Sequence, residues 1–117
     1  MYRTRLEQIL DDLYETDGVD ACIIYRIDGV PITVRTPLDS TILEVMFWLE
    51  NQIKHVLRNM NKEGLKATTF DFKNYQILIT PSSKSTILAT IINPNAHQQL
   101  ISIEIARAKS IINICVS

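Results

Sequence analysis

Apolar residues along this chain recur with two different periods, and the change from one period to the other predicts its secondary structure. Helical spacing, with apolar residues three and four positions apart, runs through residues 4–16, 39–61 and about 94–116. Shorter stretches rich in β-branched residues predict strands at 19–27, 32–34, 65–72, 75–80 and 86–92. The predicted order is helix, two strands, helix, three strands, helix, in a single domain spanning residues 1–117.

Local signals predict where several of these elements begin and end. Thr4 and Thr41 each begin a capping box, in which a hydroxyl and a glutamate three residues later satisfy free amides at a helix start. Asp28-Gly29 fits a type I′ turn between the first two strands, because both central positions of that turn need a positive φ angle. Asn93-Pro94 fits an N-cap followed by proline at the first position of the last helix.

The strand sequences also predict places in a sheet. Ile23 and Ile24 are both apolar, so the first strand is expected at the centre of the sheet with both faces covered. Pro31 cannot donate a ladder hydrogen bond, which places the second strand at an edge. The last three strands have short connections and are expected to be antiparallel neighbours. If the last of them pairs with the first hairpin, residues 65–72 form the opposite edge.

The long helix at 39–61 carries the most information about function. Its apolar residues form a stripe roughly 120° wide that should cover one face of the sheet, and they are Ile42, Val45, Met46, Leu49, Ile53, Val56, Leu57 and Met60. Phe47 and Trp48 lie outside this stripe, so we expect both on the back of the helix, where a covering helix should be polar. Two aromatic rings there favour a surface that another protein buries. The alternatives are isolated exposed side chains, which are common, or a terminal segment folded over them.

A dimer would satisfy the helix back and the strand edge together. A two-fold-related copy could pair strand 65–72 with its own equivalent and long helix with long helix. The predicted dimer interface comprises Leu43, Phe47, Trp48, Asn51, Phe70 and Phe72.

Composition and charge exclude several classes of protein. The chain has 117 residues, 46% of them hydrophobic, which is enough for a core without metals or disulfides. Its net charge is -1 and its basic residues are scattered, so we expect no nucleic-acid partner.

Cys22 and Cys115 lie in apolar surroundings and are expected to be buried free thiols, as in a reducing cytoplasm. No targeting segment is expected, and charges interrupt the apolar stretch at 100–116, so no membrane insertion is expected either.

Reactive groups do not assemble into a recognisable catalytic pattern. His55 falls on the polar back of the long helix and His97 near a helix start, so each is expected to be solvated or to cap a helix. Asp11 and Asp12 fall on the polar face of the first helix. Lys84-Ser85-Thr86 matches the tail of a phosphate-binding P-loop, but the glycines are missing. We therefore predict no enzyme activity, no metal site and no cofactor.

The turn and core residues resemble those of the Roadblock (dynein light-chain) family over nearly the whole chain. Gly18-Val19-Asp20-Ala21-Cys22-Ile23-Ile24 and Asp28-Gly29-Val30-Pro31-Ile32 resemble the family's strand-turn-strand. Ile91-Ile92-Asn93-Pro94-Asn95 resembles its last strand running into Asn-Pro. The C-terminal helix is present, as in prokaryotic and endosomal-scaffold members.

This resemblance implies an α+β fold related to profilin and longin domains. The expected architecture is a five-stranded antiparallel sheet with the long helix on one face and the terminal helices on the other. The resemblance also implies a dimer, with itself or with another Roadblock protein, formed by the long helix and the strand after it. Such dimers bind small Ras-like GTPases, and Arg58 and His55 are the candidate contacts here. Arg26 and Arg35 are further candidates, although no spacing marks any of these residues as an arginine finger.

Three functions are consistent with the sequence. The first is a cytoplasmic, non-enzymatic dimeric module that binds, and regulates, a small Ras-like GTPase. The second is a passive scaffold subunit of a larger cytoplasmic or membrane-associated complex. The third, from another class, is a small-ligand sensor built on a profilin- or longin-like fold.

Overall fold

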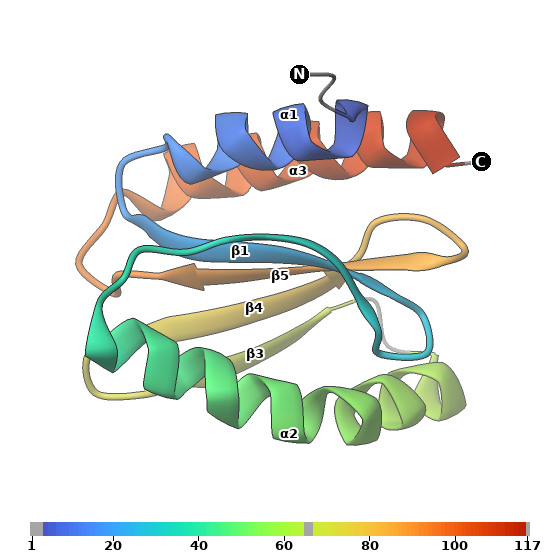
Figure 1. Cartoon of the computed structure of the whole chain (residues 1–117), viewed down its shortest axis with the longest axis horizontal. Helices are drawn as coiled ribbons and strands as arrows, with labels where there is room; N and C mark the ends of the chain where they lie inside the picture. The colour runs from blue at the N-terminus through green and yellow to red at the C-terminus, as the bar shows by residue number, and fades with distance from the viewer. Residues whose placement is uncertain (1–3, 65–66, 117) are drawn as a thin grey trace.

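The computed structural model describes residues 4–64 and 67–116, and it has the predicted order of elements (Figure 1). The helices are α1 (Arg5–Tyr14), α2 (Ser40–Glu63) and α3 (Gln98–Val116). The strands are β1 (Val19–Arg26), β2 (Pro31–Arg35), β3 (Thr68–Asp71), β4 (Gln76–Pro81) and β5 (Thr86–Ile92). The predicted strand 65–72 corresponds to β3, and its first two residues lie outside the described part of the chain.

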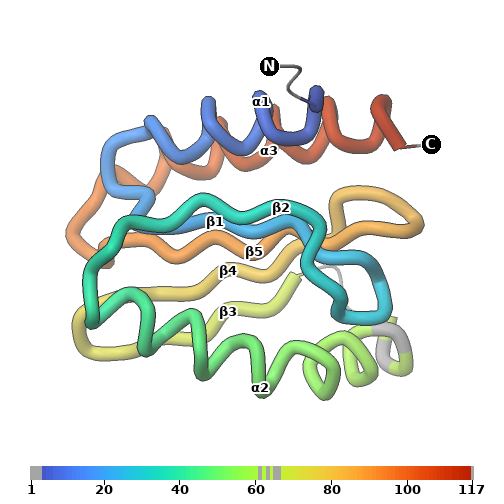
Figure 2. Tube along the Cα trace, viewed as in Figure 1, coloured from blue at the N-terminus to red at the C-terminus, as the bar shows by residue number. Residues whose placement is uncertain are grey.

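The five strands form one antiparallel sheet in the order β2-β1-β5-β4-β3 (Figure 2). The hairpin β1–β2 joins the meander β3–β4–β5 through β1 and β5, which become the central strands. This order confirms that β2 and β3 are the two edges. The edges differ, because the β1–β2 register shifts between Ile24 and Tyr25, whereas the β3–β4 register is regular.

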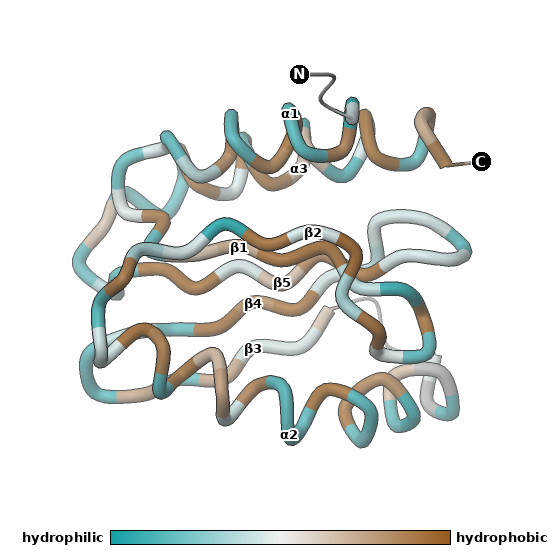
Figure 3. The backbone as a smooth tube through the Cα atoms, in the orientation of Figure 1, coloured by the Kyte–Doolittle hydropathy of each residue, from teal (hydrophilic) through white to brown (hydrophobic). Residues whose placement is uncertain are grey.

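Helices cover both faces of the sheet. Figures 1 and 3 show α2 on one face and α1 with α3 on the other, with apolar colour along the strands between them. On the α2 side, Leu49 and Ile53 pack with Ile77 of β4, while on the other side Leu10 and Ile101 pack together over β1 and β5. The predicted α2 stripe is confirmed: its members are buried, apart from Ile42 and Met46, which are partly buried against the same core.

Two of the predicted turn and cap signals are confirmed and three are wrong. The Thr4 hydroxyl accepts a hydrogen bond from the Glu7 amide at 3.1 Å, as expected of an N-cap. His97 also caps a helix, because its Nδ1 accepts from the Leu100 amide at 3.1 Å. Thr41 does not cap α2; the Asp39 carboxylate does, accepting from the amides of Thr41 and Ile42 at 2.9 and 3.2 Å.

The other two corrections concern the Asp28-Gly29 and Asn93-Pro94 turns. Asp28-Gly29 is not a type I′ turn, since Gly29 alone has a positive φ (91°) within a longer loop that is closed by Arg26 and Val30. Asn93-Pro94 does not begin α3. The Asn93 side chain instead accepts from the Asn95 amide at 2.9 Å in a local turn, and the helix begins at Gln98.

Candidate protein interface

Five of the six predicted interface residues divide between the two flanks of α2. Trp48 points to the β3 side, where it contacts Phe70 and Phe72. Leu43 and Phe47 line a groove on the opposite side, next to β2. Asn51 lies on the exposed back of the helix, and its amide donates to the Phe47 carbonyl at 3.0 Å. The set is therefore two surfaces rather than one.

On the β3 side, four rings form an aromatic cluster, defined here as Trp48, Phe70, Phe72 and Tyr75. Trp48 meets Phe70 edge to face, with ring centroids 5.6 Å apart, and meets Phe72 in the same way at 5.2 Å. Phe72 and Tyr75 lie 5.0 Å apart. The expectation that both helix aromatics point away from their own fold is therefore wrong for Trp48, which is partly buried, and correct for Phe47, which is 67% exposed.

A groove of about 370 Å³ continues from the aromatic cluster between α2 and β3. Its apolar walls include Val56, Met60 and Phe70, and its polar rim includes His55 and Asn59. The His55 ring nitrogen and the Asn59 amide lie 3.4 Å apart. Arg58 is exposed on the back of α2 and, within the described residues, makes no ion pair. The two candidate GTPase contacts thus face different directions.

The second groove, between α2 and β2, was not predicted. It has a volume of about 300 Å³ and is lined by Ile23, Tyr25, Pro31, Val34, Leu43, Met46, Phe47 and Glu50. Burial, followed by the charge of Glu50, raises the pKa of Tyr25 to about 12, so the phenol on its floor is neutral at physiological pH. The sequence did hold one signal for this groove, which is apolar Val34 on the strand that Pro31 places at the sheet edge. An edge strand has no neighbouring strand on its outer side, and Val34 is exposed in the structure.

Two of the candidate arginines are already paired within the chain. Arg26 makes an ion pair with Asp28 in its own hairpin loop. Arg35 of β2 makes one with Asp11 of α1, which ties the first helix to the edge strand. Because a partner would have to displace these carboxylates, Arg58 is the better candidate contact.

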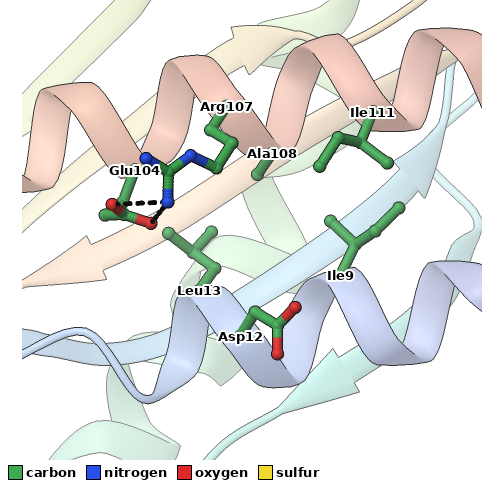
Figure 4. Close-up of a pocket in the computed structure, with 7 residues that line it drawn as sticks. All are labelled: Ile9, Asp12, Leu13, Glu104, Arg107, Ala108 and Ile111. Carbon is green, nitrogen blue, oxygen red and sulfur yellow. Dashed lines mark hydrogen bonds and ion pairs between the residues drawn. The ribbon is translucent and has the colours of Figure 1, made fainter.

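The other clefts and polar clusters of the described residues show no arrangement of reactive groups that indicates catalysis or metal binding. Figure 4 shows the cleft of about 170 Å³ between α1 and α3, where Arg107 pairs with Glu104 at 3.2 Å beside Leu13, and Ile9 lies opposite Ile111. The Ser82 and Thr86 hydroxyls lie 2.8 Å apart in the β4–β5 turn, so the sequence that matches a P-loop tail is a hairpin turn. Among the described residues, no group of three His, Cys, Asp or Glu side chains could hold a metal ion.

Both cysteines in the described part of the chain are free thiols. Cys22 is buried, as predicted, and its thiol donates to the Leu10 carbonyl at 3.5 Å. Burial raises the pKa of Cys22 to about 12. Cys115 is only partly buried, because it lies in the last turn of α3. Within the same described residues, no helix combines the length and apolarity needed to cross a membrane.

Solved structures of other proteins have the same arrangement of helices and strands. MglB of Myxococcus xanthus superposes with a TM-score of 0.74, at 12% identity, over 98% of this chain and 97% of that one. A Roadblock/LC7 domain from Streptomyces avermitilis gives 0.72 at 14% identity, over 93% and 95% of the two chains. The gliding protein MglB from Thermus thermophilus gives 0.69 at 9% identity, over 94% and 89%.

At these identities the superpositions show the fold alone, and the fold is that of Roadblock/LC7 domains. No curated protein sequence matches the chain. The family model described as AF0774-like protein matches residues 3–106, which is most of the sequence. The chain therefore belongs to the AF0774-like protein family and has the Roadblock/LC7 fold.

Proposed function

We propose that this protein is a non-enzymatic module that dimerises through the α2–β3 side and binds a small Ras-like GTPase. The observation that carries the dimer is the aromatic cluster beside an open sheet edge. Phe72 is 37% exposed and Trp48 partly buried, so one surface of the cluster faces away from the chain's own core. Exposed aromatic surface of this kind is typical of protein interfaces.

The two sheet edges favour β3 as the edge that pairs. Pro31 and the register shift near Tyr25 disrupt β2, and both features protect an edge strand from pairing. β3 has a regular register with β4 from Thr68 to Asp71. A partner strand would therefore find usable backbone groups on β3, and it would cover the groove beside it.

A dimer of this kind leaves the back and the β2 flank of α2 uncovered. Phe47, Leu43 and Arg58 lie there, and all three are exposed. We assign this surface to the GTPase, while His55, in the α2–β3 groove, falls at the dimer interface. A module that binds the switch segments of a GTPase more tightly in one conformation shifts the GTPase toward that conformation. The GTPase itself is proposed from the likeness to Roadblock proteins, and the two free cysteines fit a cytoplasmic setting.

Mass in solution tests the dimer. We expect the wild-type chain to have twice its monomer mass of 13.4 kDa. Phe72→Asp should reduce the mass to that of one chain, because it places a charge in the aromatic surface. Leu100→Asp is the matched control: Leu100 is 42% exposed on α3, in the other layer, and its substitution should leave the dimer intact. A Phe72→Asp variant that stays dimeric would refute this interface.

GTP hydrolysis tests the partner. A small Ras-like GTPase from the same cell is mixed with the purified protein, and both binding and hydrolysis are measured. Phe47→Asp should abolish binding while leaving the dimer mass unchanged, because Phe47 lies on the other flank of α2. Faster hydrolysis with the wild-type protein supports regulation, and tight binding without it supports a passive scaffold. Absence of binding would refute the GTPase as partner.

A further inference from the structure

The groove between α2 and β2 has a buried polar group on its floor, the Tyr25 hydroxyl. Tyr25 is 3% exposed, and its hydroxyl makes no hydrogen bond to any residue in the described part of the chain. The hydroxyl oxygen is not sealed in the core, however, because the fully buried side-chain oxygens without a partner belong to other residues. Tyr25 lines the groove, so its hydroxyl opens into it. A buried hydroxyl without a partner is unfavourable, and a bound ligand removes that penalty by hydrogen bonding to it.

Glu50 is the one charged residue on the wall of this groove, among the residues that the structure describes. Its carboxylate makes no ion pair and no hydrogen bond with another described residue. Burial, and then the charge of Glu50, raises the pKa of Tyr25, so the carboxylate acts on the phenol without bonding to it. The groove therefore offers two hydrogen-bond acceptors that do not satisfy each other.

The chain's own cation beside Glu50 is Lys54, one helical turn later. Both residues line the neighbouring cleft, together with Gly29. A Cβ added at Gly29 would lie 2.8 Å from Lys54 Cγ, so the lysine stem rests against the β1–β2 loop. No ion pair joins Glu50 and Lys54 in the part of the chain that is described. The Glu50 carboxylate thus stays available to a cation from outside.

The remaining walls of the groove are apolar. They are Ile23, Pro31 and Val34 from the sheet and Leu43, Met46 and Phe47 from α2. A volume of about 300 Å³ is at the small end of the range for ligand pockets, which suits one long side chain rather than a cofactor. The groove thus combines an apolar lining for a methylene stem, an exposed aromatic ring and a negative charge at the rim.

We propose that this groove binds the side chain of an arginine that a partner protein inserts. The methylene stem lies along the apolar walls, and the guanidinium group donates to the Glu50 carboxylate and to the Tyr25 hydroxyl oxygen. Arginine fits better than lysine because its planar fork carries several donors and stacks on an aromatic ring such as Phe47. The inference rests on the proposed function for the identity of the partner, the GTPase, and adds the chemistry that holds it.

Titration with n-butylguanidinium, followed by NMR of the isotopically labelled protein, tests the pocket without any partner. n-Butylurea is the matched control, because it has the same shape and no charge. We expect n-butylguanidinium to bind with a millimolar dissociation constant, as is typical of so small a ligand, and to shift the amide signals around the groove. n-Butylurea should bind about fivefold more weakly. Equal binding of the two compounds, or no shift around the groove, would refute recognition of a cation here.

Variants of the two acceptors test the assignment of each contact. Glu50→Gln should weaken n-butylguanidinium binding about fivefold, whereas Glu44→Gln, exposed on the same helix and outside the groove, should not change it. Tyr25→Phe should weaken binding about threefold without lowering the melting temperature, because the hydroxyl has no partner within the described chain. Unchanged binding by Glu50→Gln would overturn the inference, and unchanged binding by Tyr25→Phe would remove the hydroxyl from the site.

The GTPase binding assay then separates this inference from the proposed function. Glu50→Gln should weaken GTPase binding about fivefold relative to Glu44→Gln, and n-butylguanidinium should compete with the GTPase where n-butylurea does not. A GTPase that binds both variants equally well would refute arginine insertion, while the proposed function stands. A pocket that binds n-butylguanidinium in a protein that binds no GTPase would refute the proposed function and the identity of the partner, while the guanidinium site stands.

Discussion

Truncating Trp48 measures how much the aromatic cluster contributes to the free energy of unfolding of a single chain. Trp48→Ala removes two edge-to-face contacts, at centroid distances of 5.6 and 5.2 Å. Each such contact is worth about 0.5–1.5 kcal/mol beyond area burial. Full truncation of a core tryptophan costs about 3–5 kcal/mol. Because Trp48 is only partly buried, we expect a loss near the lower end, about 3 kcal/mol.

Phe47→Ala is the matched control on the same helix. Phe47 is 67% exposed, so its truncation should cost less than about 0.5 kcal/mol. Urea unfolding followed by circular dichroism gives both values. With a slope of about 2 kcal/mol per molar urea, the Trp48→Ala midpoint should fall by about 1.5 M while that of Phe47→Ala barely moves.

Unfolding at two protein concentrations separates the stability of a single chain from that of the proposed dimer. Stability that comes from association depends on protein concentration, whereas contacts within one chain contribute equally at all concentrations. We expect most of the Trp48→Ala loss to persist at the lower concentration. Equal losses for the two variants, or a Trp48→Ala loss that vanishes on dilution, would show that Trp48 does not stabilise its own subunit.

Three further predictions concern single residues elsewhere. Gly18→Ala should cost about 2–4 kcal/mol in thermal or urea unfolding, because Gly18 has φ = 94° and an added Cβ would lie 2.2 Å from a neighbouring alanine side chain. Burial, and then the charge of Asp39, raises the pKa of Asp20 above its usual 3.8, so the folded state holds that proton more tightly than the unfolded state. Stability should fall as pH rises from 3.8 through the folded pKa; Asp20→Asn should be more stable than wild type above this window and lose that advantage below it, as pH-dependent unfolding would show. A thiol reagent at a pH of about 8 should modify Cys115 quickly and Cys22 only after unfolding, because burial raises the pKa of Cys22 to about 12; rapid modification of both thiols in the native protein would contradict this.

The sequence was sufficient for the order of elements, the two sheet edges and the buried face of α2. All three depend on which residues must be buried, and periodicity reports burial directly. Pro31 marked one edge because proline lacks an amide hydrogen, and the stripe through Leu49 and Ile53 marked the covering face of the helix. These two rules, on the periodicity of buried residues and on proline at sheet edges, apply to any fold with this order of helices and strands.

Contacts between distant segments were not predictable in the same way. A step of about 100° per residue separates Trp48 from the core stripe, but it does not reveal that Phe70 and Phe72 on β3 lie within its reach. Arg35 could not be matched with Asp11, 24 residues earlier, before β2 was known to lie beside α1. From the sequence alone, Asn93-Pro94 could begin a helix or close a turn. In the structure it closes a turn, and the Asn93 amide donates a hydrogen bond to the Gly18 carbonyl at 2.9 Å.

The division of α2 into three sides explains how one helix could serve two partners. One side is committed to the core through Leu49 and Ile53, so substitutions there would unfold the chain and report on neither partner. The flank with Trp48 meets the regular edge of β3, and the flank with Phe47 meets an edge disrupted near Pro31. In the proposed dimer a copy of the chain adds a strand on the first side, whereas the proposed partner on the second side would bind through side chains alone. Dimer formation and GTPase binding should for this reason be separable by single substitutions, Phe72→Asp for the first and Phe47→Asp for the second.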